Sequence, residues 1–336
     1  MSAAPAQAAD AATGQRVSIV TPAAPGSRKG NRATAVRIAA LLRQLGCRPH
    51  ITTHWDGAPT DVLVAVHAHK SADAVFACAA QQPAARIVVL LAGTDLHPTP
   101  DATPPQLGER ALAAAARADA LVALHSLVAA TLPEELRHKT RTIVQSATAE
   151  PAPRASRFSA VLLAHLRPVK QPLLAVQALR AVPADVPFEL VLAGGRLAEA
   201  GDEAYAAQVE AAVAAEPRAR FVGELPRRDA KRLLASAHVC LVPSNAEGGA
   251  NVVSEAIAAG VPVLCSDVAG NVGLLGADWP GTFPAGDAGA LGALLTRCVR
   301  EPAFLDDLCR RTQVMQPMVA PAREREAWRR LLAELG

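Results

Sequence analysis

A glycine-containing loop between two apolar segments has the residue types that a phosphorylated ligand requires. In PSNAEGGANVVSEAIAAGVPVLCS (243–266), we expect a strand to end at Pro243 and a helix to begin near Ala250. The N–H groups and the dipole of a helix start form an anion site. Gly248 and Gly249 would allow the backbone to approach a diphosphate closely.

Two glutamates flank this expected anion site. Glu247 lies in the loop, and Glu255 lies eight residues later, in the first turns of the expected helix. Carboxylates do not bind phosphate, but they accept hydrogen bonds from hydroxyl groups. They can therefore bind sugar and ribose hydroxyls on either side of the anion. For Glu247 alone, the alternative is an exposed residue beside a capped helix.

A pair of cations follows the first strand expected in the second half of the chain. In AHLRPVKQP (164–172), Arg167 and Lys170 lie three residues apart in a loop that enters a helix, so both can reach one anion. Arginine can bind two phosphate oxygens, whereas lysine acts as a point charge. The alternative is a solvated loop end.

Together these segments resemble the retaining family-4 glycosyltransferases. The shared features are the E-x7-E signature formed by Glu247 and Glu255, the Ala-Ala-Gly-x-Pro at 258–262, the Arg/Lys pair, and the segment 221–244 that precedes the signature. The resemblance covers nearly all of 158–300.

The resemblance implies a role for each of these residues. Glu247 would face the donor sugar and act in catalysis together with Arg167 and Lys170, which would bind the diphosphate. Glu255 would hold the ribose. The remaining donor-binding residues, through their backbone N–H groups, would be Gly248, Gly249, Ala250, Asn251 and Val252.

A second group of cations follows the first expected strand of the chain. The loop TPAAPGSRKGNRATA (21–35) has three basic residues among glycines and enters a helix, whose N–H groups add to the positive potential. This density of cations departs from the family-4 pattern. We expect a second anion site here, although the charges could simply be solvated. Its candidate residues are Gly26, Arg28, Lys29, Gly30, Asn31 and Arg32.

Polar residues also follow the next expected strands of the first domain. His67 and Lys70 come after LVAV, and Thr94, Asp95 and His97 come after VVLLAG. The carboxyl ends of parallel strands meet at one edge of a sheet. We therefore assign His67, Lys70, Thr94 and Asp95 to the same acceptor site, although a single histidine at a strand end is more often structural.

The first domain resembles a smaller group, the selenosugar synthases of selenoneine biosynthesis. The similar segments are the basic loop, LVAVHAHKSA (63–72) and LLAGTDLH (90–97), and the similarity extends over almost the whole chain. It implies transfer of a hexose from a UDP-sugar, typically UDP-N-acetylglucosamine, to selenophosphate, with formation of a C–Se bond and release of UDP. Two anion sites suit one diphosphate and one small oxyanion.

The hydrophobic pattern predicts the elements that must position these residues. Short, uniformly apolar runs alternate with segments of helical periodicity, which is typical of parallel sheets covered on both faces. The expected fold class is α/β, GT-B, with two doubly wound Rossmann-like domains and an interdomain cleft. The expected strands are 16–21, 61–68, 86–93, 119–125, 141–146, 159–166, 188–195, 220–225, 238–244 and 261–266. The expected helices are 31–46, 71–82, 171–182, 203–215, 227–236, 251–259 and 323–335.

A segment rich in Pro, Ala and Ser, ATAEPAPRASR (147–157), separates the two halves. The expected organisation is a disordered tail, an acceptor-binding N-terminal domain, a linker, a nucleotide-sugar-binding C-terminal domain and a terminal helix that could cross back to the first domain. Their ranges are 1–14, 15–150, 151–157, 158–320 and 321–336.

The composition disfavours several other classes. The chain has 336 residues, of which 51% are hydrophobic and 19% charged, so two globular domains are expected. A net charge of +3 does not indicate nucleic-acid binding, and 3% aromatic residues disfavour a stacking platform for long saccharides. No apolar run reaches the roughly 18 residues of a membrane span, and the Ala-rich N-terminus lacks the features of a signal peptide.

The cysteines indicate a reducing, cytoplasmic compartment. All six lie in apolar stretches without CxxC spacing and are expected to be buried thiols. No His/Cys/carboxylate spacing indicates a metal site, and no cofactor is expected. The oligomeric state is left open.

Three alternatives remain at this point. A family-4 transferase acting on a sugar or lipid hydroxyl should present an apolar or aromatic acceptor surface. A UDP-sugar 2-epimerase would share the layout but needs acid and base carboxylates around the sugar. A UDP-sugar-binding regulator would not turn the donor over, so a donor-hydrolysis assay would distinguish it from an enzyme.

Overall fold

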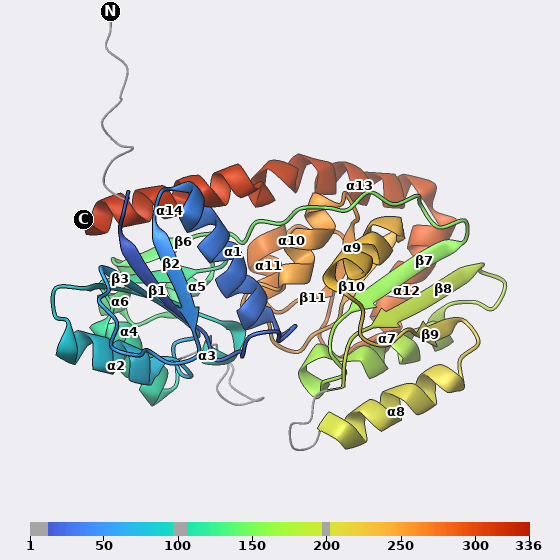
Figure 1. The fold of residues 1–336 in the computed structure, drawn as a ribbon. Coiled ribbons are helices and arrows are strands. Elements are labelled where there is room, and N and C mark those ends of the chain that lie inside the picture. The colour runs from blue at the N-terminus through green and yellow to red at the C-terminus, as the bar shows by residue number, and fades with distance from the viewer. Residues whose placement is uncertain (1–12, 97–106, 197–201) are drawn as a thin grey trace, which may run out of the picture. The chain divides into compact units, whose positions relative to one another are not determined.

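The chain forms two compact units (Figure 1). The computed structural model describes residues 13–96, 107–196 and 202–336. The first unit comprises the chain up to Gln145 together with Pro321–Gly336, and the second comprises Ser146–Ala320. The terminal helix α14 (Pro321–Leu335) therefore belongs with the first unit, although it follows the second in sequence. Most of the expected N-terminal tail, and His97, lie outside the described residues.

The first unit contains a six-stranded, fully parallel sheet with the order β2-β1-β3-β4-β5-β6. The direction of this order reverses between β1 and β3, which is where ligands bind in open parallel sheets. The strands are β1 (Arg16–Val20), β2 (Arg48–Thr52), β3 (Val62–Val66), β4 (Arg86–Leu90), β5 (Ala120–Ala123) and β6 (Thr140–Thr142). The helices besides α14 are α1 (Gly30–Gln44), α2 (Ala72–Gln81), α3 (Gly93–Leu96), α4 (Glu109–Arg117), α5 (Val128–Thr131) and α6 (Glu134–Arg137).

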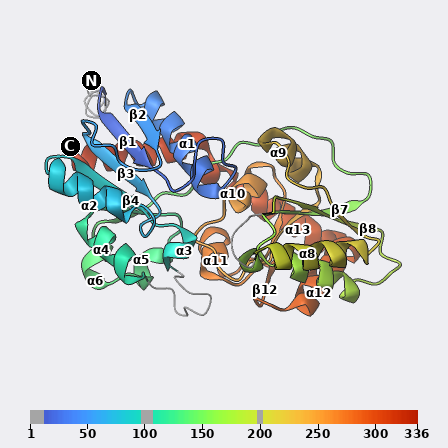
Figure 2. The ribbon, with the colours of Figure 1, turned by 60° about the horizontal axis from the view of Figure 1, so that its bottom comes forward.

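Apolar side chains cover both faces of this sheet. On one face, α2 and α4 contribute a cluster of small residues, mostly alanines, to the core. On the other face, α1 and α14 pack against alternate residues of β1, β3 and β4, and Trp328 of α14 is 1% exposed. Figure 2 shows α1 beside β1 and β2. Because both faces are covered, the central strands are uniformly apolar, as the sequence pattern predicted.

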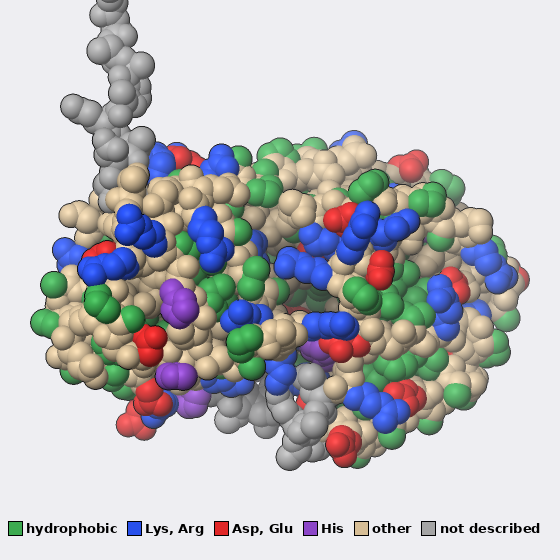
Figure 3. All heavy atoms as spheres, viewed as in Figure 1, with side chains coloured by type: hydrophobic (Ala, Val, Ile, Leu, Met, Phe, Trp, Pro, Cys, Tyr) green, Lys and Arg blue, Asp and Glu red, His purple; other side chains and the backbone are tan. Residues whose placement is uncertain are grey.

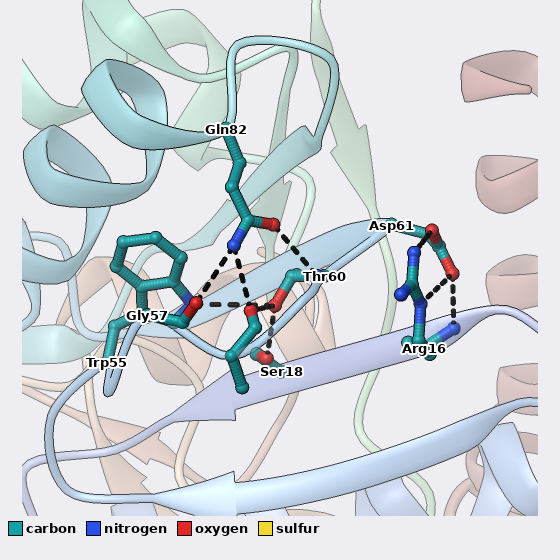
Figure 4. A network of polar contacts seen from close by, with 8 residues as sticks. Arg16, Ser18, Trp55, Gly57, Thr60, Asp61 and Gln82 are labelled. Atoms are coloured by element: carbon teal, nitrogen blue, oxygen red, sulfur yellow. Dashed lines mark hydrogen bonds and ion pairs between the residues drawn. The ribbon is translucent and has the colours of Figure 1, made fainter.

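In the first unit, side-chain hydrogen bonds connect β1 with the loop that precedes β3 (Figure 4). The Ser18 and Thr60 hydroxyls lie 2.7 Å apart, and the Gln82 amide accepts from the Thr60 N–H and donates to the Gly57 carbonyl. Arg16 also pairs with Asp61 across adjacent strands. This network fixes the loop before β3 at the amino ends of the strands, which is the edge of the sheet opposite their carboxyl ends.

The second unit repeats the plan with the order β12-β11-β10-β7-β8-β9, again with every strand pair parallel. Its strand order reverses between β7 and β10. The strands are β7 (Phe158–Leu163), β8 (Phe188–Ala193), β9 (Ala219–Phe221), β10 (Val239–Val242), β11 (Val263–Ser266) and β12 (Thr282–Phe283). The helices are α7 (Pro172–Ala178), α8 (Asp202–Ala214), α9 (Arg227–Ser236), α10 (Asn251–Ala258), α11 (Ala269–Leu275), α12 (Ala288–Arg300) and α13 (Pro302–Met315), with 3₁₀ turns η1 (Pro168–Lys170), η2 (Leu179–Ala181) and η3 (Gln316–Val319).

Three local expectations were wrong. Strand β2 was missed, because this edge strand is only partly buried and contains Pro49 rather than an apolar run. The helix expected over 171–182 changes to a 3₁₀ turn at Leu179, shortly before Val182, whose following proline disfavours helical backbone. The strand expected over 141–146 pairs only over Thr140–Thr142.

Candidate functional site

The two cations of the second unit lie at the carboxyl end of β7. Arg167 precedes η1, and Lys170 is its last residue. Gln171, the next residue, has φ +52°, a left-handed conformation that is uncommon for residues other than glycine. This turn ends η1 and starts α7, so Lys170 is held at a sharp change of chain direction rather than on a loose loop.

Glu247 is buried and receives two hydrogen bonds on the same oxygen. Its Oε1 lies 2.7 Å from Lys170 Nζ and 2.6 Å from Ser244 Oγ, and its side chain is 7% exposed. The Asn245 N–H also donates to the Val169 carbonyl at 2.9 Å. The loop after β10 and the turn after β7 are therefore joined by a backbone hydrogen bond and an ion pair. Glu247 is therefore not an exposed residue beside a capped helix, which was the alternative interpretation of the sequence.

The loop containing Glu247 leads directly into α10. Gly249 has φ +109°, which a residue with a side chain rarely adopts. Ala250 is the N-cap and provides no side-chain hydrogen bond to the helix start. The start of α10 thus has the geometry that sequence reasoning expected for an anion-binding helix terminus.

Glu255 lies on α10, half-buried and close to Lys231 of α9. Burial lowers the pKa of Lys231 below its usual value, and Arg227 lowers it further, whereas Glu255 and Glu150 oppose that shift. The Lys231 ammonium donates to the Thr148 hydroxyl and carbonyl. Glu255 therefore lies close enough to Lys231 to interact with its charge.

A buried polar network lies behind the Glu247 loop. Ser266 donates to the Ser244 carbonyl, and the Asn271 amide donates to the Ser266 carbonyl at 3.1 Å. Ser266 and Asn271 are fully buried. A Cβ atom at Gly270 would lie 2.2 Å from the Glu247 carbonyl oxygen, so α11 can approach this loop only because residue 270 lacks a side chain.

The arrangement coincides with the switch point of its own sheet. β7 and β10 are hydrogen-bonded neighbours, and the strand order runs away from them in both directions. Arg167 and Lys170 follow β7, whereas Glu247 and the start of α10 follow β10. The fold thus brings the two motifs, separated by almost 80 residues, to the crevice where open parallel sheets bind ligands.

In the first unit, the basic loop (21–35) follows β1, one of the two strands between which the strand order reverses. It leaves β1 at Thr21 and enters α1, whose N-cap is Lys29. Arg28 and Lys29 are exposed. Arg32 Nη1 and Thr21 Oγ1 are buried atoms with no hydrogen-bond partner among the described residues. Each end of the loop therefore contains a buried polar atom whose hydrogen-bonding capacity is not used by the described residues.

His67 and Asp95 form a buried pair at the carboxyl ends of β3 and β4. His67 Nδ1 lies 2.7 Å from Asp95 Oδ1, and their side chains are 3% and 0% exposed. The Asp95 carboxylate also accepts from the backbone N–H groups of Ala68, His69 and Ala92, each at 2.8 Å. These contacts hold His67 at φ +77°, an uncommon backbone conformation for a histidine. Asp95 thus fixes the loop and the ring rather than projecting its carboxylate into solvent.

The other expected acceptor residues are less constrained. Lys70, Gly26 and Gly30 are exposed, and Asn31 is half-buried. Thr94 lies in α3, and its side chain is outside the described part of the structure. Sequence reasoning missed Thr21, Ser244 and Asp202, whose carboxylate lies 3.2 Å from Arg167 Nε. Thr21 and Ser244 had a detectable signal, because Thr21 directly follows the apolar β1 and Ser244 lies two residues after the apolar β10, whereas Asp202 had none.

The described ranges also bear on the expectations for metal ligands, membrane-spanning helices and cysteines. Residues 13–96, 107–196 and 202–336 contain no group of three or more His, Cys, Asp or Glu side chains that could hold a metal ion. None of their helices is both long and apolar enough to cross a bilayer. Five of the six cysteines are buried, and burial raises the pKa of Cys265 and of Cys298 to about 12. On the face in Figure 3, both basic and acidic side chains lie on the surface of each unit.

Comparison with known proteins finds similarity to glycosyltransferases in part of the chain. Residues 147–311 match the family described as glycosyl transferases group 1. The putative teichuronic acid biosynthesis glycosyltransferase TuaC of Bacillus subtilis is 36% identical over 90 residues, which are 26% of this chain and only 23% of that relative.

Solved structures show a similar fold over nearly the whole chain. Sucrose-phosphate synthase from Thermosynechococcus elongatus has a TM-score of 0.78 at 17% identity, covering 96% of this chain and 99% of the other. Anabaena HepE in complex with UDP and glucose has a TM-score of 0.74 at 15% identity, covering 95% and 100%. The fold is GT-B, with two Rossmann-like domains, and the match of the second unit supports a glycosyltransferase of group 1.

Proposed function

We propose that this protein transfers a hexose from a UDP-sugar to selenophosphate, forming a C–Se bond and releasing UDP. The observation that carries the donor half is the ion pair of Lys170 with the buried Glu247, which lies near Arg167 and the start of α10 at the switch point of the second sheet. The acceptor half rests on the basic loop at the switch point of the first sheet.

The donor site has the groups that a nucleotide diphosphate requires. Arg167, Lys170 and the N–H groups at the start of α10 supply positive potential for the diphosphate. Glu255 would accept hydrogen bonds from the ribose, and Glu247 from the sugar. A Lys170 that already contacts Glu247 is oriented before the donor arrives, which is the type of preorganisation that stabilises leaving-group charge most effectively.

The acceptor site suits a small, multiply charged ion. Arg28 and Lys29 are exposed cations beside the start of α1, and Arg32 Nη1 and Thr21 Oγ1 are buried without a partner among the residues described. Phosphate oxygens would satisfy these groups. A hexose or lipid acceptor would instead require apolar or aromatic contacts, and the aromatic content of the chain is 3%.

The proposed reaction needs no activated hydroxyl. A selenium lone pair of selenophosphate attacks the anomeric carbon, the bond from that carbon to the diphosphate oxygen breaks, and UDP leaves with the bonding electrons. The nucleophile is already anionic at neutral pH, so a general base is not required. We propose N-acetylglucosamine as the transferred hexose.

The test is mass spectrometry of products formed from several UDP-sugars with selenophosphate, thiophosphate or phosphate. We expect a selenosugar, with UDP-N-acetylglucosamine as the preferred donor. Replacing both Arg28 and Lys29 by Ala should raise the KM for selenophosphate and leave UDP affinity unchanged. The matched control is Arg43→Ala with Arg48→Ala, which removes two exposed cations of the same unit outside the basic loop. Equal selenosugar formation by both double variants would contradict the acceptor site.

The same assay separates the alternatives. UDP release only with a sugar or lipid hydroxyl would indicate an ordinary group 1 transferase. UDP binding with neither transfer nor hydrolysis of the donor would indicate a regulator.

A further inference from the structure

We infer that Asp202 is a positioning residue, whose buried carboxylate orients the Arg167 guanidinium for the donor diphosphate. This inference deepens the proposed function and rests on it, because the role of Arg167 at the diphosphate belongs to that proposal. Asp202 itself is not expected to touch the donor.

The contact joins two elements that are distant in sequence. Arg167 Nε lies 3.2 Å from Asp202 Oδ2, across 35 positions of the chain. Arg167 stands immediately before η1, and Asp202 is the first residue of α8. One turn later in α8, the Tyr205 hydroxyl accepts a hydrogen bond from the Leu173 N–H at 3.4 Å. The start of α8 is thus attached to the η1–α7 segment at two points.

Burial distinguishes this ion pair from the Arg196–Glu210 pair of the same helix. The Asp202 side chain is 9% exposed and that of Arg167 33%. By contrast, Glu210 on the same helix is 28% exposed and pairs with Arg196, which is 61% exposed. Exposed pairs contribute little because both side chains are solvated and mobile. A buried carboxylate requires a charged partner, so Asp202 strongly favours one position of the Arg167 side chain.

The chemical consequence follows from the shape of the guanidinium. Arginine is planar, and its N–H groups diverge in fixed directions, so a contact at Nε constrains the directions of the others. Lys170 is held in the same manner by Glu247. Each cation assigned to the diphosphate is therefore oriented by its own buried carboxylate. Preorganisation of this kind reduces the entropy lost when the anion binds.

The experiment combines Asp202→Ala, Asp202→Asn and Asp202→Glu with Arg167→Ala, alone and in the Asp202→Ala double variant. The measurements are UDP affinity by calorimetry and kcat and KM for donor turnover. Asp202→Ala should lower kcat/KM about tenfold, the size of one lost charge-assisted hydrogen bond. In the Arg167→Ala background, Asp202→Ala should have no further effect. Asp202→Glu should recover activity better than Asp202→Asn, since it retains the charge.

The control is Glu203→Ala, which removes a carboxylate from the next, exposed position of α8 and should change nothing. Losses that multiply in the double variant would overturn the inference, because they would show that Asp202 acts independently of Arg167. Unchanged UDP affinity and turnover in Asp202→Ala would overturn it as well. A wild-type protein that binds no UDP would instead refute the proposed function.

Discussion

At Glu247 a single carboxylate oxygen accepts hydrogen bonds from both Lys170 and Ser244. A carboxylate buried to this degree keeps its charge only if its partners compensate for the lost hydration. The ammonium and the hydroxyl do so, and they also orient the carboxylate. The charge of Glu247 is thereby paired before a ligand binds, whereas its second oxygen is the group that could meet a sugar hydroxyl.

The first prediction at this scale concerns Glu255. Glu255→Ala should weaken UDP binding roughly ten- to a hundredfold, because a hydrogen bond to a charged partner contributes about 1.5–3 kcal/mol. Calorimetry with UDP measures the effect. Glu189→Ala is the control, since it breaks an exposed ion pair with Arg220 in the same unit. Unchanged UDP affinity in Glu255→Ala would remove this residue from the donor site.

A second prediction concerns divalent cations. Arg167, Lys170 and the start of α10 provide the positive field that the UDP leaving group requires, so donor turnover should continue in EDTA. The assay compares UDP-sugar hydrolysis and transfer with and without EDTA, followed by added magnesium or manganese. Activity abolished by EDTA and restored by either metal would refute this prediction.

Whether a residue of the site could be predicted depends on how far it lies in sequence from its partners and on what brings them together. Glu247, Gly249 and Glu255 lie within one short motif, and the structure places them on one loop and the helix that follows it. The contact of Lys170 with Glu247 spans 77 positions, yet it follows from the expected parallel sheet, since both residues come after neighbouring strands. Asp202 could not be found in this way. It starts a helix, and only the packing of α8 against α7 brings it to Arg167.

At the scale of elements, α11 supports the candidate site without belonging to it. Its Asn271 and the preceding Ser266 hold the loop after β10 from behind, and Gly270 permits the close approach of the helix. The hydrophobic pattern predicted the central strands for a related reason, since sheets covered on both faces require continuous apolar runs. It missed β2, because an edge strand has no such requirement.

Gly270→Ala should therefore lower both stability and donor turnover. Its Cβ atom would lie 2.2 Å from the Glu247 carbonyl oxygen, so either α11 or the loop must move. Overpacking of this kind costs about 1–3 kcal/mol. Thermal unfolding and donor kinetics measure the two effects. Gly289→Ala, at an exposed position of α12, is the control, because the nearest atom there is Asp287 Oδ1 at 3.3 Å and no backbone atom outside the helix lies within 4 Å. If Gly270→Ala behaves like the control, the tight contact does not position Glu247.

At the scale of the molecule, the chain enters and leaves the first unit beside one buried polar cluster. Gln145, the last residue of that unit before the second, accepts hydrogen bonds from Thr34 and Arg37 of α1. Arg37 also pairs with Glu324 of α14 at 3.0 Å, with side chains 11% and 2% exposed. Just inside the second unit, the Ala147 N–H donates to the Val319 carbonyl at 3.0 Å. The two connections are thus fixed at defined residues of each unit.

The terminal helix should therefore determine the stability of the first unit rather than the second. Trp328 is 1% exposed and packs in the core formed by α1, β1 and β3, so Trp328→Ala should destabilise that core by about 3–5 kcal/mol. A protein of two units need not unfold in one step, so hydrogen exchange resolved by peptide is the appropriate measurement. Exchange should increase in α1 and β1 and remain unchanged in β7 and β10. Val314→Ala, at a position 76% exposed on α13, serves as the control and should alter neither set. Faster exchange confined to β7 and β10 in Trp328→Ala would contradict the prediction, because it would mean that α14 stabilises the unit it follows in sequence.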